Sequence, residues 1–224
     1  MPQRRDVRAG PFPAEPFVSS RPERRTQAER SAYTRSVLLD AAIKTLFERG
    51  YASTTTTLVA TEAGISRGAM LHQFSTKSDL MIFVVEEVFR REVAQYAELL
   101  RGIDGPRDRG LAYTEAVWSV LSQPSGVAVL EILQGSRGDP ELGGRLRVTQ
   151  ARIEEEALAV LKNYFEGGVS LAMMRLVVWA ARGLSIAKML APDPDSIDDA
   201  MQALNTLISN SFDLARLTAN RNDA

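Results

Sequence analysis

Few residues of this chain are suited to covalent chemistry. The sequence holds no cysteine and a single histidine, His72, so disulfide frameworks and thiolate metal sites are excluded. Nucleophilic and metal-assisted hydrolysis are also disfavoured, because such reactions usually depend on cysteine or histidine side chains. The carboxylate that lies closest after His72 along the chain is Asp79. We therefore expect no catalytic residue, no metal site and no cofactor.

The residues with the most chemical promise are suited to recognition, and they gather in "TLVATEAGISRGAMLHQF", residues 57–74. A glycine inside a helix costs about 1 kcal/mol relative to alanine, so Ala-Gly-Ile-Ser indicates two helices joined by a tight turn. Gly64 would supply the positive φ of that turn without a Cβ penalty. Ser66 would cap the second helix by accepting a hydrogen bond from the amide of Gly68 or Ala69.

The start of this second helix presents groups that fit a DNA groove. Arg67, Gly68 and Ala69 are expected to be exposed there, at the positive end of the helix dipole, beside a phosphate. Arg67 is the best candidate for reading a base, because a guanidinium can bond O6 and N7 of guanine together. Pairing of Arg67 with a phosphate alone is the alternative. We expect His72 to be a neutral groove contact.

Apolar residues would hold the two helices at a fixed angle. Ala60 must be small because the next helix crosses over it, while Ile65 and Met70 fill the junction. Phe74, at the end of the second helix, belongs to the same structural set. An ordinary helical hairpin in a core has a similar pattern, and it stays open as an alternative at this point.

The pattern of the whole chain is helical. Residues 1–25 hold five prolines among arginines without apolar periodicity, and we predict a disordered tail over 1–29. No window alternates with period 2 for long enough to indicate a strand, so the fold class is all-α. The first helix is expected from the N-cap Thr34 to just before Gly50, and the second is a short helix that carries Val59, Ala60 and Ala63 and ends at Gly64. The later helices are expected at about 67–74, 77–100, 108–122, 125–136, 140–165, 168–190 and 196–220.

From Thr34 to Leu80 the chain resembles the tetracycline-repressor (TetR) family of bacterial transcription regulators. The matching stretch is "LLDAAIKTLFERGYASTTTTLVATEAGISRGAMLHQFSTKSDL". Besides the Gly64 turn, the resemblance rests on a helix ending in Gly50-Tyr51, a Thr54-Thr55 cap and Lys77 at the start of the next helix. It implies a three-helix DNA-binding head at 30–80 on a larger helical body at 81–224, which binds an effector and dimerises.

The resemblance also implies roles for single residues of the head. Thr55 and Lys77 match phosphate-contacting positions, and Leu71 stands where the family usually has a tyrosine, so one hydroxyl-to-phosphate bond is missing. A leucine there could contact a thymine methyl group or only fill space. The other positions that match DNA contacts are Ser66, Arg67, Gly68 and His72.

In the body, the resemblance implies a dimer made by the last two helices and an apolar effector pocket in the middle helices. The apolar stripe of the last helix gives the interface candidates Met201, Leu204, Ile208 and Phe212, although such a stripe can also face the chain's own core. The pocket candidates are Tyr113, Trp118, Leu133 and Trp179, in a region whose aromatic content is equally typical of a core.

The sequence thus predicts a homodimeric, ligand-responsive DNA-binding regulator, a repressor released from a palindromic double-stranded operator by a small, largely apolar effector. We expect no enzymatic activity, no membrane association and a cytoplasmic location. The alternative is a helical-bundle carrier or enzyme in which the head is only structural. A net charge of −1 disfavours nonspecific DNA coating. Arg24, Arg25 and Arg30 could form a minor-groove arm, but a solvated tail is the simpler interpretation.

Overall fold

The computed structural model describes residues 26–165, 171–193 and 195–222, and it describes their side chains except at 106, 107, 209 and 211–222. In these ranges the regular elements are all helical, which confirms the predicted fold class. The helices are α1 Gln27–Ser53, α2 Thr56–Glu62, α3 Arg67–Gln73, α4 Lys77–Leu99, α5 Pro106–Leu121, α6 Pro124–Gly135, the short 3₁₀ turn η1 Ser136–Gly138, α7 Pro140–Leu161, α8 Leu171–Leu190 and α9 Asp195–Asn222.

The first helix starts earlier than predicted. Thr26 caps α1 in a capping box: its hydroxyl accepts from the Glu29 amide at 3.2 Å, and the Glu29 carboxylate accepts from the Thr26 amide at 2.6 Å. The prediction of Thr34 as N-cap is therefore wrong, and its hydroxyl instead donates to the Arg30 carbonyl at 2.9 Å. The first turns of α1 are mostly exposed and polar, so apolar periodicity does not mark them. Residues 26–29, assigned to the tail from sequence, form this cap and first turn, whereas Arg24 and Arg25 lie outside the described residues.

The turn between α2 and α3 has the local geometry that the sequence predicts. Gly64 has φ of 64°, and the Ile65 amide donates to the Ala60 carbonyl at 2.9 Å. Together with the bond from the Gly64 amide to the Thr61 carbonyl at 3.1 Å, this is a Schellman ending of α2. Ser66 then caps α3 by accepting from the amide of Ala69 at 3.2 Å. The chain therefore reverses sharply and starts a second helix at once.

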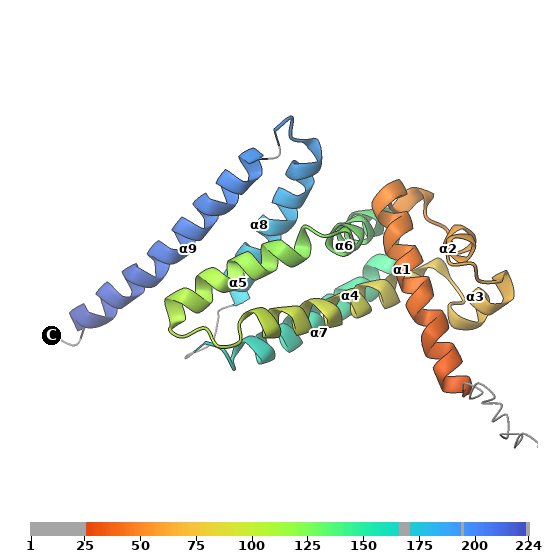
Figure 1. Cartoon of the computed structure of the whole chain (residues 1–224), viewed down its shortest axis with the longest axis horizontal. Coiled ribbons are helices and arrows are strands. Elements are labelled where there is room, and N and C mark those ends of the chain that lie inside the picture. Colours follow the sequence, from red (N-terminus) through yellow and green to blue (C-terminus); the bar gives the residue numbers. More distant parts are fainter. Residues whose placement is uncertain (1–25, 166–170, 194, 223–224) are drawn as a thin grey trace, which may run out of the picture.

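The head and the body share one hydrophobic core. Side chains of α1, α2 and α3 meet those of α4, α6 and α7 in a single buried cluster. The head, at the right of Figure 1, is thus fixed to the body by burial of apolar surface. Fully buried members of this cluster include Leu38, Leu39, Leu46, Val59, Met70, Leu80, Met81, Val84, Ile132 and Leu142.

A second core lies in the body, further from the head. It joins the end of α4 to α5, α7, α8 and α9, with Tyr113, Val117, Met174 and Val177 buried at its centre. The long helix α9 packs on α5 and α8, along the edge of the body opposite α4 and α7 (Figure 1). By length and composition, no single helix in the described ranges could cross a membrane. The bent pair 108–121 and 124–138 meets that test only when its two parts are taken together.

Replacing Gly64 by alanine should destabilise the protein by about 1–2 kcal/mol, because a side chain at positive φ is strained even where space is free. The matched control is Gly68→Ala in α3, where an added Cβ also meets nothing within 4 Å. There alanine should leave stability unchanged or raise it by up to about 1 kcal/mol through its helix propensity. Urea unfolding of both variants measures the difference, and two changes of the same sign would contradict the role assigned to Gly64.

Candidate nucleic-acid interface and internal pocket

One face of α3 is exposed and the other is anchored in the head. Arg67, Ala69 and His72 lie on the exposed face, together with Leu71, whose side chain is 47% exposed. Met70, on the opposite face, is buried in the shared core. In Figure 1, α3 lies at the far right of the molecule, beyond α1 as seen from the body. The helix is thus free to dock along the side that the sequence assigns to DNA.

The predicted structural residues lie at the junction between α2 and α3. Ala60, Met70 and Phe74 are buried, and Ile65 packs partly buried against the same core. Gly68 is exposed on the first turn of α3, as the sequence predicts.

The C-terminal end of α3 is tied to α1 and α4. The Gln73 side-chain amide donates to the Ser31 hydroxyl at 3.2 Å. The Phe74 ring lies 4.9 Å from the Phe83 ring, and the Arg35 guanidinium sits over both rings, at 5.0 and 4.3 Å. These contacts fix the direction of α3 relative to two longer helices, so the exposed face moves with them.

The two predicted phosphate contacts differ in availability. Thr55 is exposed at the start of α2, where its hydroxyl accepts from the Leu58 amide at 3.1 Å and keeps its own proton for a further acceptor. Lys77 is half-buried: its Nζ donates to the Tyr51 carbonyl at 2.7 Å and lies 3.8 Å from the centre of the Tyr51 ring. Burial lowers the pKa of Lys77, and Asp139 opposes this shift. The ammonium has two further protons to donate.

Tyr51 connects the head to the body. Its amide donates to the Glu131 carboxylate at 3.0 Å and its hydroxyl donates to Asp139 at 3.2 Å. Burial and the charge of Asp139 raise the pKa of Tyr51 to about 12. The kink at Gly50, with φ of 73°, turns Tyr51 toward α6, and a Cβ at Gly135 would lie 2.2 Å from its ring. Sequence reasoning identified Gly50-Tyr51 as an ending of a helix but missed these partners, which are at least 80 residues away along the chain.

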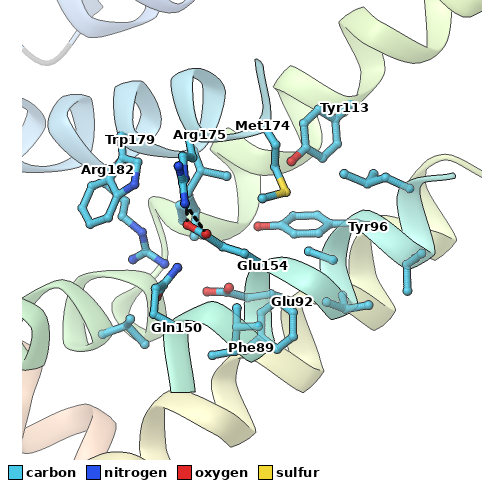
Figure 2. Close-up of a pocket in the computed structure, with 18 of the residues that line it drawn as sticks. Phe89, Glu92, Tyr96, Tyr113, Gln150, Glu154, Met174, Arg175, Trp179 and Arg182 are labelled. Carbon is cyan, nitrogen blue, oxygen red and sulfur yellow. Dashed lines mark hydrogen bonds and ion pairs between the residues drawn. The ribbon is translucent and has the colours of Figure 1, made fainter. Parts of the chain in front are cut away.

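An internal pocket lies in the body between α4, α5, α7 and α8 (Figure 2). The cavity that remains open to a solvent-sized molecule is about 70 Å³. Ligand sites usually reach roughly 300–1,000 Å³, so a drug-sized ligand would need the walls to move apart. Across the pocket, Arg175 donates twice to Glu154, at 3.1 and 2.6 Å. These two charges neutralise one another, and the pairing raises the pKa of Arg175 and lowers that of Glu154.

Two of the four predicted pocket residues line this cavity, Tyr113 and Trp179. The other two lie outside its lining. Trp118 packs against the second core, 5.5 Å from the Lys188 ammonium, and Leu133 packs against the core shared with the head. Among the described residues, no group of three or more His, Asp or Glu side chains could hold a metal ion.

Comparison with known proteins agrees with the geometry of the head. Residues 38–82 match the family model described as bacterial regulatory proteins, tetR family. The head therefore belongs to the TetR family. The whole chain is a transcriptional regulator with a DNA-binding domain.

Relatives of this chain are also named as transcriptional regulators. An HTH-type transcriptional regulator of Mycobacterium tuberculosis is 25% identical over 190 residues, which cover 83% of this chain and 97% of that protein. The HTH-type transcriptional regulator CymR of Pseudomonas putida is 42% identical, over 82 residues that cover 35% of this chain and 40% of CymR.

Solved structures share the fold. A TetR transcription regulator from Haloarcula marismortui has a TM-score of 0.61 at 18% identity, covering 80% of this chain and 98% of that one. The fatty acid degradation regulator FadR from Bacillus halodurans has a TM-score of 0.61 at 16% identity, covering 79% and 94%.

The pocket of this regulator contains a buried acid that sequence reasoning missed. Glu92, on α4, is 5% exposed, and its Oε1 has no hydrogen-bond partner. Burial raises the pKa of Glu92 to about 7, and the positive charge of Arg182 opposes this shift only partly. The signal was available in the sequence: Glu92 falls four residues after Val88 and seven after Val85, on the apolar face of α4.

Three of the four predicted dimer residues of α9 pack toward the interior of their own chain. Met201 and Ile208 are 5% and 4% exposed, and Leu204 packs against the second core. The chain's own α5 and α8 pack on α9, and a dimer interface at these three residues stays a prediction. The side chain of Phe212 lies outside the described residues.

Replacing Glu92 by glutamine should stabilise the protein above pH 7. The folded-state pKa of Glu92 exceeds its ordinary value of 4.5, so the folded state holds this proton more tightly. The stabilisation that the folded protein gains from this tighter proton binding is complete below about pH 4.5 and is lost as the pH rises through about 7. A shift of one pKa unit corresponds to about 1.4 kcal/mol. The free energy of unfolding of Glu92→Gln, relative to that of the parent, should therefore be about 3 kcal/mol higher at pH 8 than at pH 4.

Urea unfolding at pH 4 and pH 8 measures this difference. Glu115→Gln, at an exposed acid of α5, is the control and should change stability little at either pH. An advantage of Glu92→Gln that is equal at the two pH values would contradict the buried, partnerless carboxyl group.

Proposed function

We propose that this protein is a homodimeric repressor that leaves a palindromic operator when a small molecule binds the internal pocket. The observation that carries the proposal is α3, whose exposed face begins at Arg67 while its buried face is tied to α1 and α4. The pocket is lined by the same α4. One rigid helix thereby connects a DNA-facing surface to a cavity.

The exposed face of α3 supports docking in the major groove. Arg67 lies at the N-terminal end, where it can reach the edge of a guanine, and Ser66 and His72 flank it along the helix. Thr55 keeps a hydroxyl proton for a phosphate at the start of α2. We assign Lys77 to a second phosphate, which its ammonium would contact while keeping its bond to the Tyr51 carbonyl. Leu71 is exposed and can meet a thymine methyl group.

A second copy is needed because one recognition helix buries too little surface for tight specific binding. We assign the contact between copies to the outer face of α8. The exposed residues of that helix that alternate at spacings of four and three are apolar or glycine, which is the spacing of helices that pack along one another. They are Ala172, Leu176, Trp179, Gly183, Ile186 and Leu190. Leu207, 68% exposed on α9, extends the apolar face.

The release mechanism is a shift between two states of the dimer. The N-terminal end of α4 is held by the bond from Lys77 to Tyr51 and by the ion pair of Asp79 with Arg145 at 2.9 Å. A ligand that widens the narrow pocket moves α4, and the head moves with it. A hundredfold loss of operator affinity then requires about 2.7 kcal/mol of preference of the ligand for the released state.

Arg67→Ala should weaken binding to the operator by about 10- to 100-fold and relax its sequence preference, because a bidentate contact to guanine contributes about 1–3 kcal/mol. Lys77→Ala should weaken binding to all sequences alike and lower the salt slope by about one. Arg101→Ala, which removes the same charge from an exposed site in the body, is the control. Mobility shifts on DNA upstream of the gene, at several salt concentrations, measure all three.

Unchanged retention of DNA by both head variants at moderate salt would overturn the repressor function. Thermal unfolding of Lys77→Ala is recorded in parallel, because that variant also loses an internal hydrogen bond.

Leu176→Glu should convert the dimer to a monomer, since the two-fold axis would place two buried carboxylates in one interface. Val148→Glu is the matched control, because Val148 is an equally apolar and even more exposed residue of α7. Sedimentation velocity over a range of protein concentrations distinguishes the two states. If both variants stay dimeric, the interface lies on another face.

A further inference from the structure

The internal pocket contains an acceptor that the protein itself leaves without a donor. Figure 2 shows the carboxyl group of Glu92 directed from α4 into the cavity, and its Oε1 has no hydrogen-bond partner. Buried polar atoms are nearly always paired, because an unpaired one loses its hydration without compensation. A ligand that carries a hydrogen-bond donor into the cavity would satisfy this unpaired oxygen.

The other charges around the cavity leave Glu92 without a protein counter-ion at that oxygen. On α8, Arg175 is committed to Glu154 of α7 by two hydrogen bonds. Arg182, also on α8, donates to the Gly126 carbonyl at 3.4 Å and lies 5.9 Å from the centre of the Trp179 ring. The remaining titratable groups in the cavity wall are three phenols, and one of them, Tyr164, donates its hydroxyl proton to the Ala97 carbonyl at 3.4 Å. Burial raises the pKa values of the other two, Tyr96 of α4 and Tyr113 of α5. Both phenols are therefore neutral at ordinary pH.

The rest of the wall is aromatic and aliphatic. Phe89, Tyr96, Tyr113 and Trp179 contribute rings to the cavity, and the faces of such rings attract cations. An anionic ligand would instead have to approach Glu92 and Glu154 while the guanidinium of Arg175 is already occupied. The combination of an acid without a partner and several rings thus favours a ligand with one positive charge and an apolar body.

We propose that the effector is an amphiphilic amine, whose protonated nitrogen donates a hydrogen bond to Oε1 of Glu92 while its apolar part packs among the aromatic rings. This inference rests on the proposed function and adds the chemical class of the effector. Glu92 lies on α4, so its ion pair with the amine would form on the helix whose first residue, Lys77, bonds to Tyr51 of the head.

Binding of such a ligand should be coupled to the release of a proton. Burial raises the pKa of Glu92 to about 7, so the acid is mostly neutral at pH 6, whereas an ammonium requires the carboxylate. The affinity for the amine should therefore rise with pH below 7 and level off above it. Between pH 6 and pH 8 the expected gain is about tenfold.

Isothermal titration of the full chain with three probes that share one apolar body tests the inference. The probes are 4-phenylbutylamine, 4-phenylbutan-1-ol and 4-phenylbutyrate, each used at up to about 5 mM at pH 6 and pH 8. At pH 8 we expect the amine to bind at least about tenfold more tightly than the alcohol. We also expect that only the amine binds more weakly at pH 6.

Glu92→Gln should abolish both the preference for the amine and its dependence on pH, while binding of the alcohol is retained. Glu115→Gln, at an exposed acid of the same charge, should keep both properties. This pair separates the Glu92 carboxylate from the general acidity of the body.

Equal affinities for amine and alcohol, tighter binding of the carboxylate, or no binding of the amine at 5 mM would each overturn the inference. Operator binding, measured on the same preparation, tests the proposed function separately. A protein that binds its operator but prefers the carboxylate contradicts only the amine, whereas a protein that binds the amine but no DNA contradicts only the repressor.

Discussion

The packing of α1 against α6 is the constraint on which the rest of the structure depends. It brings Tyr51 onto Gly135 so closely that a larger residue at 135 would collide with the ring. The kink at Gly50 makes this approach possible, and Glu131 and Asp139 then satisfy the tyrosine amide and hydroxyl. Without this contact the head would be connected to the body mainly through α4, and the shared hydrophobic core could not close.

A rigid junction of this kind suits a regulator better than a flexible hinge. If the head could tilt freely, a movement in the body would be absorbed at the junction instead of reaching α3. Here the first turn of α4 is held from two sides, by Tyr51 of α1 and by Arg145 of α7. A displacement of α4 would therefore have to move α3 with it or break these contacts.

Local signals predicted the head well, because its folding rules act over a few residues. The positive φ of Gly64 and the cap at Ser66 follow from neighbouring residue types alone. The start of α1 was missed because its polar first turns carry no periodic apolar signal. The apolar stripe of α9 was correctly seen as a stripe, but a stripe does not reveal what covers it. Here Met201 and Ile208 meet the chain's own α5 and α8.

The pocket was the hardest part to predict, since its walls come from four helices whose rotation the sequence does not fix. Tyr113 and Trp179 reached the cavity, whereas Trp118 and Leu133, of similar character, turned to other cores. Glu92 was overlooked among the many acids of the body, because its burial depends on α7 and α8 lying over it. Only the assembled helices turn this ordinary residue into a buried acid whose Oε1 has no hydrogen-bond partner.

Trp179 belongs to two surfaces of the molecule and would connect self-association with the binding of a small molecule. It lines the internal cavity and is also 47% exposed on the outer face of α8. A neighbouring copy resting on that face would press on a wall of the cavity. Self-association and small-molecule uptake would then be thermodynamically linked, so the apparent dissociation constant of an effector would change as the protein is diluted.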